Sequence, residues 1–206
     1  MANLDKCVPF YLKYAAEMER LYPPPEDPDD PRVEGLPNLD LLLKKINLVG
    51  DTAKREVAEF LEACEPGIVE HFRTISTVRR TRNNLEKTWD LSFKVAPMKA
   101  TDRHFWTGVC IEPKRAALIP WVWCFGGRRA EDEVVRILGR GLKSATFPDW
   151  DSGSVGLAEI KIPISERLEE PVECDSLVAQ VQQAFASFTA REVDAIAGIA
   201  SNRGEA

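Results

Sequence analysis

Residues 88–125 decide the fold, and they read TWDLSFKVAPMKATDRHFWTGVCIEPKRAALIPWVWCF. Apolar and polar residues alternate in three runs, over residues 88–95, 104–111 and 117–125. Alternation with a period of two is typical of strands that are buried on one face. Because only short connections separate the runs, we expect an antiparallel meander. Pro120 has no backbone N–H to donate, so the third strand should lie at a sheet edge or carry a bulge.

The residues before this meander have a helical period. Apolar side chains form one stripe over residues 7–21, and further helices are expected over residues 39–48 and from the capping residue Asp51 onward. Glu65-Pro66-Gly67 should end the latter helix, because proline lacks the backbone donor and clashes with the preceding turn. A last helix is predicted over residues 68–78.

The residues after the meander give alternating helix and strand signals. Residues 128–142 have the period of a helix, and residues 157–164 that of a strand. Helical stripes follow over residues 177–188 and from a capping pair, Thr189 and Glu192. The predicted fold class is therefore α+β: an antiparallel sheet of four or more strands with flanking helices, preceded by a helical N-terminal region.

Residues 23–31 separate the first predicted helix from the rest of the chain. They read PPPEDPDDP, a composition that buries no apolar area, so we expect an extended, solvated linker or an acidic docking strip. The chain then divides into a helical region, residues 1–87, and an α+β core, residues 88–206, which we expect to form one compact unit. All five tryptophans lie in the second region, which should contain the main core.

The composition is that of a folded, acidic protein. The net charge of −6 argues against a broad nucleic-acid surface, which needs an excess of Lys and Arg. The chain has no basic leader followed by an apolar run and no stretch of about 18 apolar residues, so we expect a cytoplasmic protein that does not associate with membranes. The five cysteines contain no C-x-x-C pair and are expected to be buried free thiols: Cys7, Cys64, Cys110, Cys124 and Cys174.

One short pattern contains the residue types of a metal-dependent catalyst. Pro148-Asp149 is followed, after nine residues, by Glu159-Ile160-Lys161. The pattern resembles the signature of the PD-(D/E)XK nuclease superfamily. The resemblance implies that Asp149 and Glu159 hold a divalent cation, Mg²⁺ or Mn²⁺, and that Lys161 positions or activates the attacking water. Glu159 and Lys161 meet one requirement of this chemistry, because residues two apart on a strand share a face.

The same residues have a simpler interpretation, as solvent-side residues of a half-exposed strand. Under the nuclease hypothesis, Glu131 or Glu133 on the preceding helix would supply a further carboxylate. The carboxylates of Asp149 and Glu159 should then lie within about 5–6 Å, close enough to share one cation. No cofactor is predicted outside this hypothesis, because the sequence has neither a glycine-rich phosphate motif nor a histidine-rich metal motif.

Three arginines, Arg79, Arg80 and Arg82, follow the predicted helix over residues 68–78. Cations near a helix C-terminus complement its dipole, which is sufficient reason for them. The alternative is a contact to an anion or to nucleic acid.

Aromatic residues occupy both faces of the predicted hairpin. Trp121 and Trp123 share a face with Phe125, whereas Trp106 lies on the opposite face of its strand from Phe105. Either helices cover both faces, or one face binds a partner. We therefore expect an interaction or regulatory protein without catalytic activity, which binds another protein through this aromatic region or through the acidic strip. A metal-dependent nuclease is the alternative.

Overall fold

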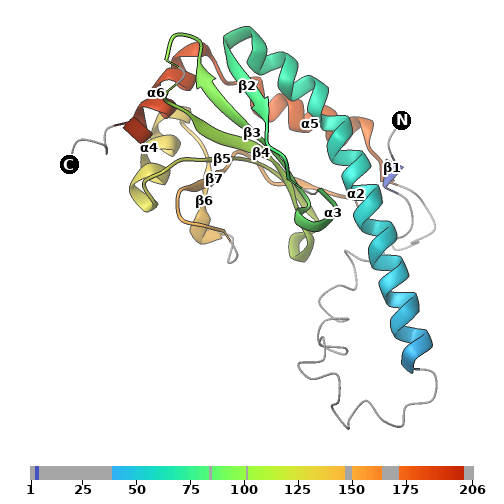
Figure 1. Cartoon of the computed structure of the whole chain (residues 1–206). Coiled ribbons are helices and arrows are strands. Elements are labelled where there is room, and N and C mark those ends of the chain that lie inside the picture. Colours follow the sequence, from blue (N-terminus) through green and yellow to red (C-terminus); the bar gives the residue numbers. More distant parts are fainter. Residues whose placement is uncertain are drawn as a thin grey trace.

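The structure is a computed structural model, and it describes residues 3–4, 39–83, 85–100, 102–146, 150–163 and 172–201 (Figure 1). The predicted helix over residues 7–21, the linker at residues 23–31 and Asp149 lie outside the described residues. The fold class is α+β, with an antiparallel sheet and flanking helices, as the sequence predicts.

An antiparallel sheet forms the centre of the fold. Its strands in the described residues are β2 (Ser76–Arg80), β3 (Asp90–Pro97), β4 (Phe105–Glu112), β5 (Ala117–Trp123), β6 (Leu142–Lys143), β7 (Ser154–Gly156) and β8 (Ile160–Lys161). They follow the order β2-β3-β4-β5-β7-β6, and β8 pairs separately with β5. The predicted meander is thus confirmed as β3, β4 and β5.

Helices pack against one face of this sheet (Figure 1). The long helix α2 (Leu39–Ile75) contacts β2 and β3, α6 (Ala190–Ser201) contacts β3 and β4, and α5 (Asp175–Phe185) contacts β5. Helix α4 (Arg128–Leu138) contacts α6, β6 and β7, whereas α3 (Leu85–Thr88) is a single turn before β3. Two more short strands, β1 (Asn3–Leu4) and β9 (Val172–Glu173), pair with each other.

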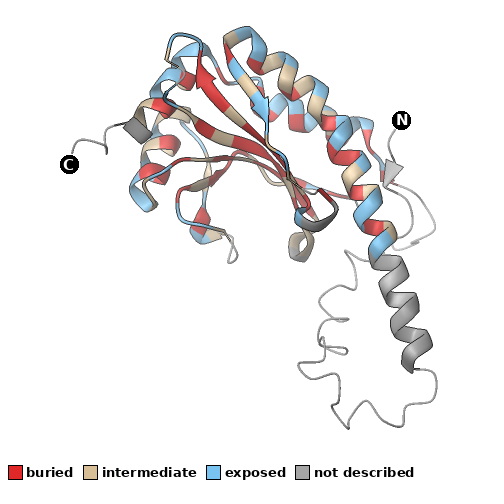
Figure 2. Ribbon diagram, viewed as in Figure 1, coloured by how far each residue is buried: buried red, intermediate tan, exposed pale blue. Residues whose placement is uncertain are grey.

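The side chains that alternate along the meander supply the sheet side of the core. Figure 2 shows the central strands as largely buried. From the helices, Phe72 packs between Phe185 and Phe188, with ring centroids 5.9 and 5.4 Å apart. Opposite them on the sheet lie fully buried residues: Leu91, Phe93, Val95, Phe105, Val109 and Val122. Alternate residues of the three strands thus face the helices, as the period of two in the sequence predicts.

Helix α2 is continuous, so the predicted break at Glu65-Pro66-Gly67 is wrong, and Asp51 lies inside the helix and does not cap it. Pro66 is exposed, and a Cβ at Gly67 would overlap the side chain of Gln182 on α5, so the glycine permits the close approach of two helices. Tertiary packing keeps the helix intact, because buried side chains recur every three or four residues through the segment: Phe60, Cys64, Ile68 and Phe72.

Residues 76–80 form the sheet-edge strand β2, so the helix predicted over residues 68–78 is too long. The helix ends at Ile75, where the Ser76 hydroxyl donates to the carbonyl oxygen of Phe72 at 2.8 Å. The segment is rich in β-branched residues and pairs with β3 along its whole length. Pairing with an existing strand outweighs the weak helical period of so short a segment.

Pro120 predicted a sheet edge or a bulge, and the structure shows the second: β5 lies inside the sheet, and between the pairs Trp121–Gly156 and Leu118–Ile160 three residues, 157–159, lie opposite two, 119–120. β4 pairs with one side of β5, and β7 and β8 pair with the other. Pro120 faces the interval between β7 and β8, where its carbonyl oxygen accepts the N–H of Leu157 at 2.7 Å. Because the partner strand is interrupted there, the missing donor of Pro120 removes no ladder bond.

Two local signals explain the ends of the C-terminal helices. α4 ends earlier than predicted because Gly139 adopts a left-handed conformation with φ 66°. Thr189 and Glu192 form the predicted capping box before α6: the Glu192 carboxylate accepts the Thr189 backbone N–H at 2.7 Å. The predicted buried free thiols are confirmed for Cys64, Cys124 and Cys174, whereas Cys110 is half-buried and Cys7 lies outside the described residues. Burial raises the pKa of Cys64 and of Cys124 to about 12.

Candidate functional site on the aromatic sheet face

The tryptophans predicted to bind a partner share one face of the sheet, the face that does not meet the helical core. Strand register aligns its side chains in three rows: Asp90, Cys110 and Ile119; Ser92, Gly108 and Trp121; Lys94, Trp106 and Trp123. We name these nine residues the aromatic face. The structure therefore brings Trp106, Trp121 and Trp123 together on one side of three adjacent strands.

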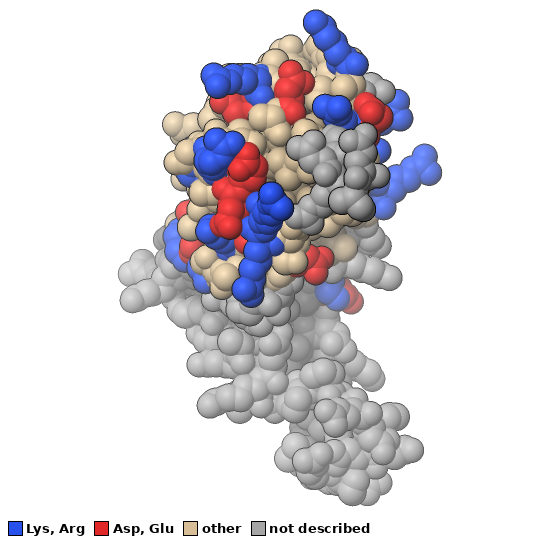
Figure 3. All heavy atoms as spheres, turned by 90° about the vertical axis from the view of Figure 1, so that its left-hand side faces the viewer, with Lys and Arg blue, Asp and Glu red and all other residues tan. Residues whose placement is uncertain are grey.

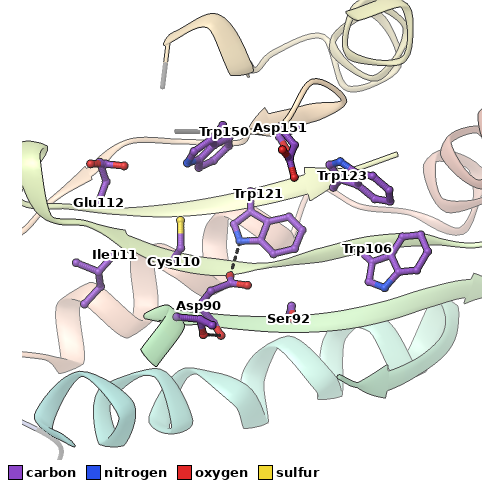
Figure 4. Close-up of a pocket in the computed structure, with 12 residues that line it drawn as sticks. Asp90, Ser92, Trp106, Cys110, Ile111, Glu112, Trp121, Trp123, Trp150 and Asp151 are labelled. Carbon is purple, nitrogen blue, oxygen red and sulfur yellow. Dashed lines mark hydrogen bonds between the residues drawn. The ribbon is translucent and has the colours of Figure 1, made fainter. Parts of the chain in front are cut away.

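A cavity of about 500 Å³ opens on the aromatic face (Figure 4). This volume is in the range of pockets that hold small molecules or large side chains. Tryptophans and carboxylates dominate its lining, and none of the described residues in that lining is Lys, Arg or His. The lining residues are Thr88, Asp90, Ser92, Trp106, Cys110, Ile111, Glu112, Trp121, Trp123, Trp150, Asp151 and Ser154.

Asp90 is the carboxylate at the centre of this cavity. Its Oδ1 accepts a hydrogen bond from Trp121 Nε1 at 2.8 Å, which is the dashed line in Figure 4. Burial raises the pKa of the Asp90 carboxyl to about 6, although the Trp121 hydrogen bond acts in the opposite direction. A partly desolvated carboxylate with a perturbed pKa in a concave site is typical of a functional residue.

Gly108 allows Trp121 to reach Asp90 across β4. In the register, Gly108 lies between Ser92 on β3 and Trp121 on β5, so no side chain stands between those two residues. A Cβ at Gly108 would also overlap the backbone carbonyl oxygen of Leu91. The glycine is therefore required both for the close approach of β3 and for the open space above β4.

The backbone before Asp90 is held in an uncommon conformation. Trp89 has φ 50°, in the left-handed region that bulky residues rarely adopt. Its N–H donates to the carbonyl of Leu85 at 2.9 Å, and its carbonyl accepts the N–H of Ile111 at 3.0 Å. These two hydrogen bonds fix the chain direction at the point where Asp90 enters β3. Local strain of this kind concentrates at functional sites.

Cys110 is the sulfur-bearing residue of the cavity. Burial, followed by the nearby charges of Asp90 and Glu112, raises its pKa well above the usual value. Its Sγ lies 3.7 Å from the carbonyl oxygen of Ile119. Because the thiolate is the reactive form, these surroundings make Cys110 a poor nucleophile.

Residues 150–154, the covering segment, line one side of the cavity through Trp150, Asp151 and Ser154, and the buried carboxylate of Glu131 anchors this segment and Ser144. Glu131 Oε1 accepts the hydroxyl of Ser144 and the backbone N–H of Gly153, both at 2.7 Å. Trp150 and Asp151, which line the cavity, lie between these two anchor points. Under the nuclease hypothesis, Glu131 or Glu133 was predicted to supply a further metal ligand. In the structure, the Glu131 carboxylate instead accepts hydrogen bonds from Ser144 and Gly153.

An aromatic cluster extends the face beyond the cavity. The Trp106 ring centroid lies 5.1 Å from that of Trp123 and 5.3 Å from that of Phe125. Phe125 is 52% exposed, so the cluster presents apolar surface to solvent. His104 packs edge-on against Trp106 at 4.5 Å, and burial together with Lys94 lowers the pKa of its imidazole. This part of the face can accept apolar groups.

The three arginines of the predicted anion site do not converge. Arg80 turns toward α2, where it pairs with Glu65 at 2.6 Å and with Glu62 at 3.4 Å. Arg79 lies opposite Lys94 in the β2–β3 register, and alternation directs it to the other side of the strand from Arg80. Arg82 follows the strand and is exposed. The contact of Arg80 with α2 accounts for one cation without any ligand.

Glu159 and Lys161 lie together, as the sequence predicts, and form an ion pair. Arg115 Nη1 also contacts Glu159, at 3.2 Å, while its Nη2 donates to the carbonyl oxygen of Thr146 at 2.6 Å. These cations lower the pKa of the Glu159 carboxyl, with the Lys161 hydrogen bond as the largest cause. Only Ile160–Lys161 of the predicted strand forms β8.

A shared metal ion would require the carboxylates of Asp149 and Glu159 to converge. Asp149 lies outside the described residues, so its distance to Glu159 is not defined. In the described part of the chain, no group of three or more His, Cys, Asp or Glu side chains is arranged to hold a metal ion. The positions of Glu159 and Lys161 are equally those of a surface ion pair that links β8 to Arg115.

The outer surface gives two further observations. On the side of the molecule that Figure 3 presents, the basic and acidic side chains of the described residues are interspersed, so these residues form no continuous basic surface of the kind typical of nucleic-acid binding. Among the helices in the described residues, none has the length and apolar content needed to cross a lipid bilayer.

Sequence reasoning identified the tryptophans of this site but missed Asp90, Cys110 and the covering segment. Alternation over residues 88–95 indicates only that Asp90 lies on the polar side of its strand, and the sequence predicts Cys110 only as a buried free thiol. The register of three strands, which pairs Asp90 with Cys110, was the missing information. Once the strands are aligned, alternation places both Asp90 and Cys110 on the face of Trp106.

Comparison with known proteins gives no relative: the chain matches no protein-family model, no curated protein and no solved structure.

Proposed function

We propose that this chain is a non-catalytic binding protein that holds a partner protein against its aromatic face. The observation that carries the proposal is the grouping of Trp106, Trp121 and Trp123 on a sheet face that α2, α5 and α6 do not cover. Tryptophan is among the residues most enriched at the centres of protein interfaces. The exposed ring of Phe125 extends this surface.

The chemistry of the cavity supports binding over catalysis. Asp90 can exchange a proton near neutral pH, but the thiol of Cys110 is held in its unreactive form. Neither histidine lines the cavity, and His71 contacts the carbonyl oxygen of Phe188 on the helical side. Within the described residues, the cavity therefore lacks the pairing of nucleophile and base that covalent catalysis needs.

The proposal is tested by co-purification from a native lysate with three forms of the chain. Wild type and Arg73→Ala, which alters an exposed residue of α2, should capture the same protein, whereas Trp123→Ala should capture at least about tenfold less, as expected for an interface hot spot. Circular dichroism verifies that each form is folded. Retention of the partner by folded Trp123→Ala, or the absence of any stable partner, contradicts the proposal.

A metal-dependent nuclease is the second candidate, favoured by the adjacent positions of Glu159 and Lys161. The test is cleavage of DNA with Mg²⁺ or Mn²⁺ by wild type and by Glu159→Ala. Cleavage that requires Glu159 would support the nuclease and contradict the non-catalytic proposal. Absence of cleavage by wild type would exclude this candidate under those conditions.

A further inference from the structure

We propose that the partner inserts an arginine side chain into the cavity, with its guanidinium paired to Asp90 and stacked on the surrounding indoles. This inference rests on the proposed function, because it identifies the group that anchors the partner at the same site. The inference specifies which side chain of the partner enters the cavity, whereas the aromatic surface alone does not identify that side chain.

Charge complementarity is the first argument. Asp90, Glu112 and Asp151 line the cavity, and among the described residues that line it none is Lys or Arg. Two cations lie on the same side of the sheet. Lys94 is four residues from Asp90, about 13 Å along an extended strand. Lys161 lies in the row of Glu112 and Ala117 and is paired with Glu159. A cationic group is therefore the occupant that the lining favours, and an anion would meet three carboxylates.

The tryptophans supply the second argument. The negative face of an indole attracts a cation, and tryptophan is the most effective aromatic residue in this respect. Trp121 and Trp150 lie beside the carboxylates in the lining, and Trp106 and Trp123 extend the aromatic wall (Figure 4). A lining in which carboxylates alternate with indoles favours a ligand group that is both positively charged and able to stack on an aromatic ring.

Geometry favours guanidinium over ammonium. A guanidinium is planar and weakly hydrated, so it can stack on an indole while it donates N–H bonds in its own plane to a carboxylate. In the described part of the chain, the Asp90 carboxylate accepts one side-chain hydrogen bond, from Trp121 to Oδ1. That bond holds the carboxylate in place and leaves Oδ2 to accept from the ligand.

The aromatic cluster indicates how the rest of the partner lies. The cavity is contiguous with the cluster of Trp106, Trp123 and Phe125, whose rings lie 4.6 to 5.3 Å apart. Apolar residues next to the inserted arginine can pack there. The anchor and this apolar contact together would bury more surface than the cavity alone.

The test is a titration with N-acetyl-arginine amide, followed by the indole N–H resonance of Trp121, which Trp121→Phe assigns. We expect a saturable shift. N-acetyl-citrulline amide has nearly the same shape without the charge and should bind about tenfold more weakly or not at all, because a charge-assisted hydrogen bond is lost. Asp90→Asn should reduce arginine binding to a similar degree, while Glu112→Gln at the rim should have a smaller effect.

Acidification provides an independent readout. Because the Asp90 pKa is about 6, binding of the arginine amide should weaken about tenfold between pH 7.5 and pH 5 as the carboxyl takes up a proton. The other titratable or charged groups in the described residues on this side of the sheet are Cys110, Glu112, Asp151, His104, Lys94, Arg79 and Lys161. Comparison with Asp90→Asn isolates the contribution of Asp90, since the variant keeps all of these groups.

Three outcomes would overturn the inference: equal binding of arginine and citrulline amides, tighter binding of N-acetyl-lysine amide, or no saturable response at up to tens of millimolar. The proposed function fails separately. If the lysate partner depends on Trp123 but arginine amide does not bind, only the arginine anchor is wrong. If arginine amide binds at Asp90 but Trp123→Ala captures the partner as well as wild type does, only the proposal that the partner binds the aromatic face is wrong.

Discussion

The two faces of the central sheet carry aromatic residues of different kinds. On the helical side, Phe72, Phe105 and Phe188 are buried, and their rings have no polar atom to satisfy. On the aromatic face, Trp106, Trp121 and Trp123 are only partly buried and lie among carboxylates. One alternating sequence therefore builds two different surfaces. One surface stabilises the fold, and the other remains available to a ligand.

The largest expected effect comes from truncating one aromatic side chain on each face and comparing the losses in the free energy of unfolding. Phe72→Ala removes a ring between Phe185 and Phe188 and should lower the free energy of unfolding by about 3–5 kcal/mol. Trp123→Ala should cost less than half as much, because its site is already open to solvent. Urea denaturation of both variants measures the difference, and equal losses would contradict a division of roles between the faces.

The segment that covers the cavity depends on a buried carboxylate. Glu131→Ala removes the acceptor for Ser144 and Gly153 and should lower the free energy of unfolding by about 2–3 kcal/mol. It should also shift the tryptophan emission, since Trp150 lies in the released segment. Glu133→Ala on the exposed side of α4 is the matched control and should have little effect. An unchanged emission spectrum in Glu131→Ala would show that other contacts hold the segment.

Asp90 should make stability depend on pH in a direction opposite to that of ordinary paired carboxylates. Its folded-state pKa of about 6 exceeds the ordinary value of 3.8, so the folded state retains a proton that the unfolded state releases. The associated stability is present below pH 3.8 and is lost as pH rises through 6. Relative to Asp90→Asn, wild type should lose on the order of 2 kcal/mol between pH 4 and pH 7.

Chemical denaturation of both proteins across this pH range measures the effect. Carboxyls whose pKa is lowered, such as Glu159 and Glu192, change stability in the opposite sense but are present in both proteins and cancel in the difference. A pH-independent difference would mean that Asp90 titrates alike in the folded and unfolded states.

The smallest effect is expected at the sheet edge. Arg80→Ala removes ion pairs with Glu62 and Glu65 that are partly exposed, so the free energy of unfolding should fall by about 0.5 kcal/mol. It should leave arginine-amide binding unchanged, because Arg80 points to α2 and away from the aromatic face. A loss above about 2 kcal/mol would show that this pair, unlike most surface ion pairs, is a major tie between α2 and β2.

Much of the fold is local in origin and could be predicted. The strands at residues 88–125 follow from alternation, and the capping box at Thr189 follows from two side chains three residues apart. The break expected at Pro66 and the helix expected through Val78 were wrong, because contacts with α5 and with β3 decide those segments. Such contacts join residues that are distant in the sequence and leave no periodic signal.

In the candidate site, too, some features follow from the local sequence and others depend on contacts between distant residues. Trp121 and Trp123 could be placed on one face from their spacing, but the bond from Trp121 to Asp90 spans 31 residues of sequence. The cover over the cavity depends on Glu131, whose partners lie 13 and 22 residues away. Neither contact could be predicted without the register of the strands and the path of the loop.

By itself, the sequence determined the fold class, the three strands of the meander and the side to which each of their side chains points, because steric alternation acts within a few residues. The tertiary structure alone decided that α2 runs unbroken through Pro66, that Pro120 lies inside the sheet, and that Asp90 meets Trp121 in a cavity. The physical reason is that burial and hydrogen bonding between distant segments outweigh local preferences, which amount to only about 1 kcal/mol per residue for most residue types.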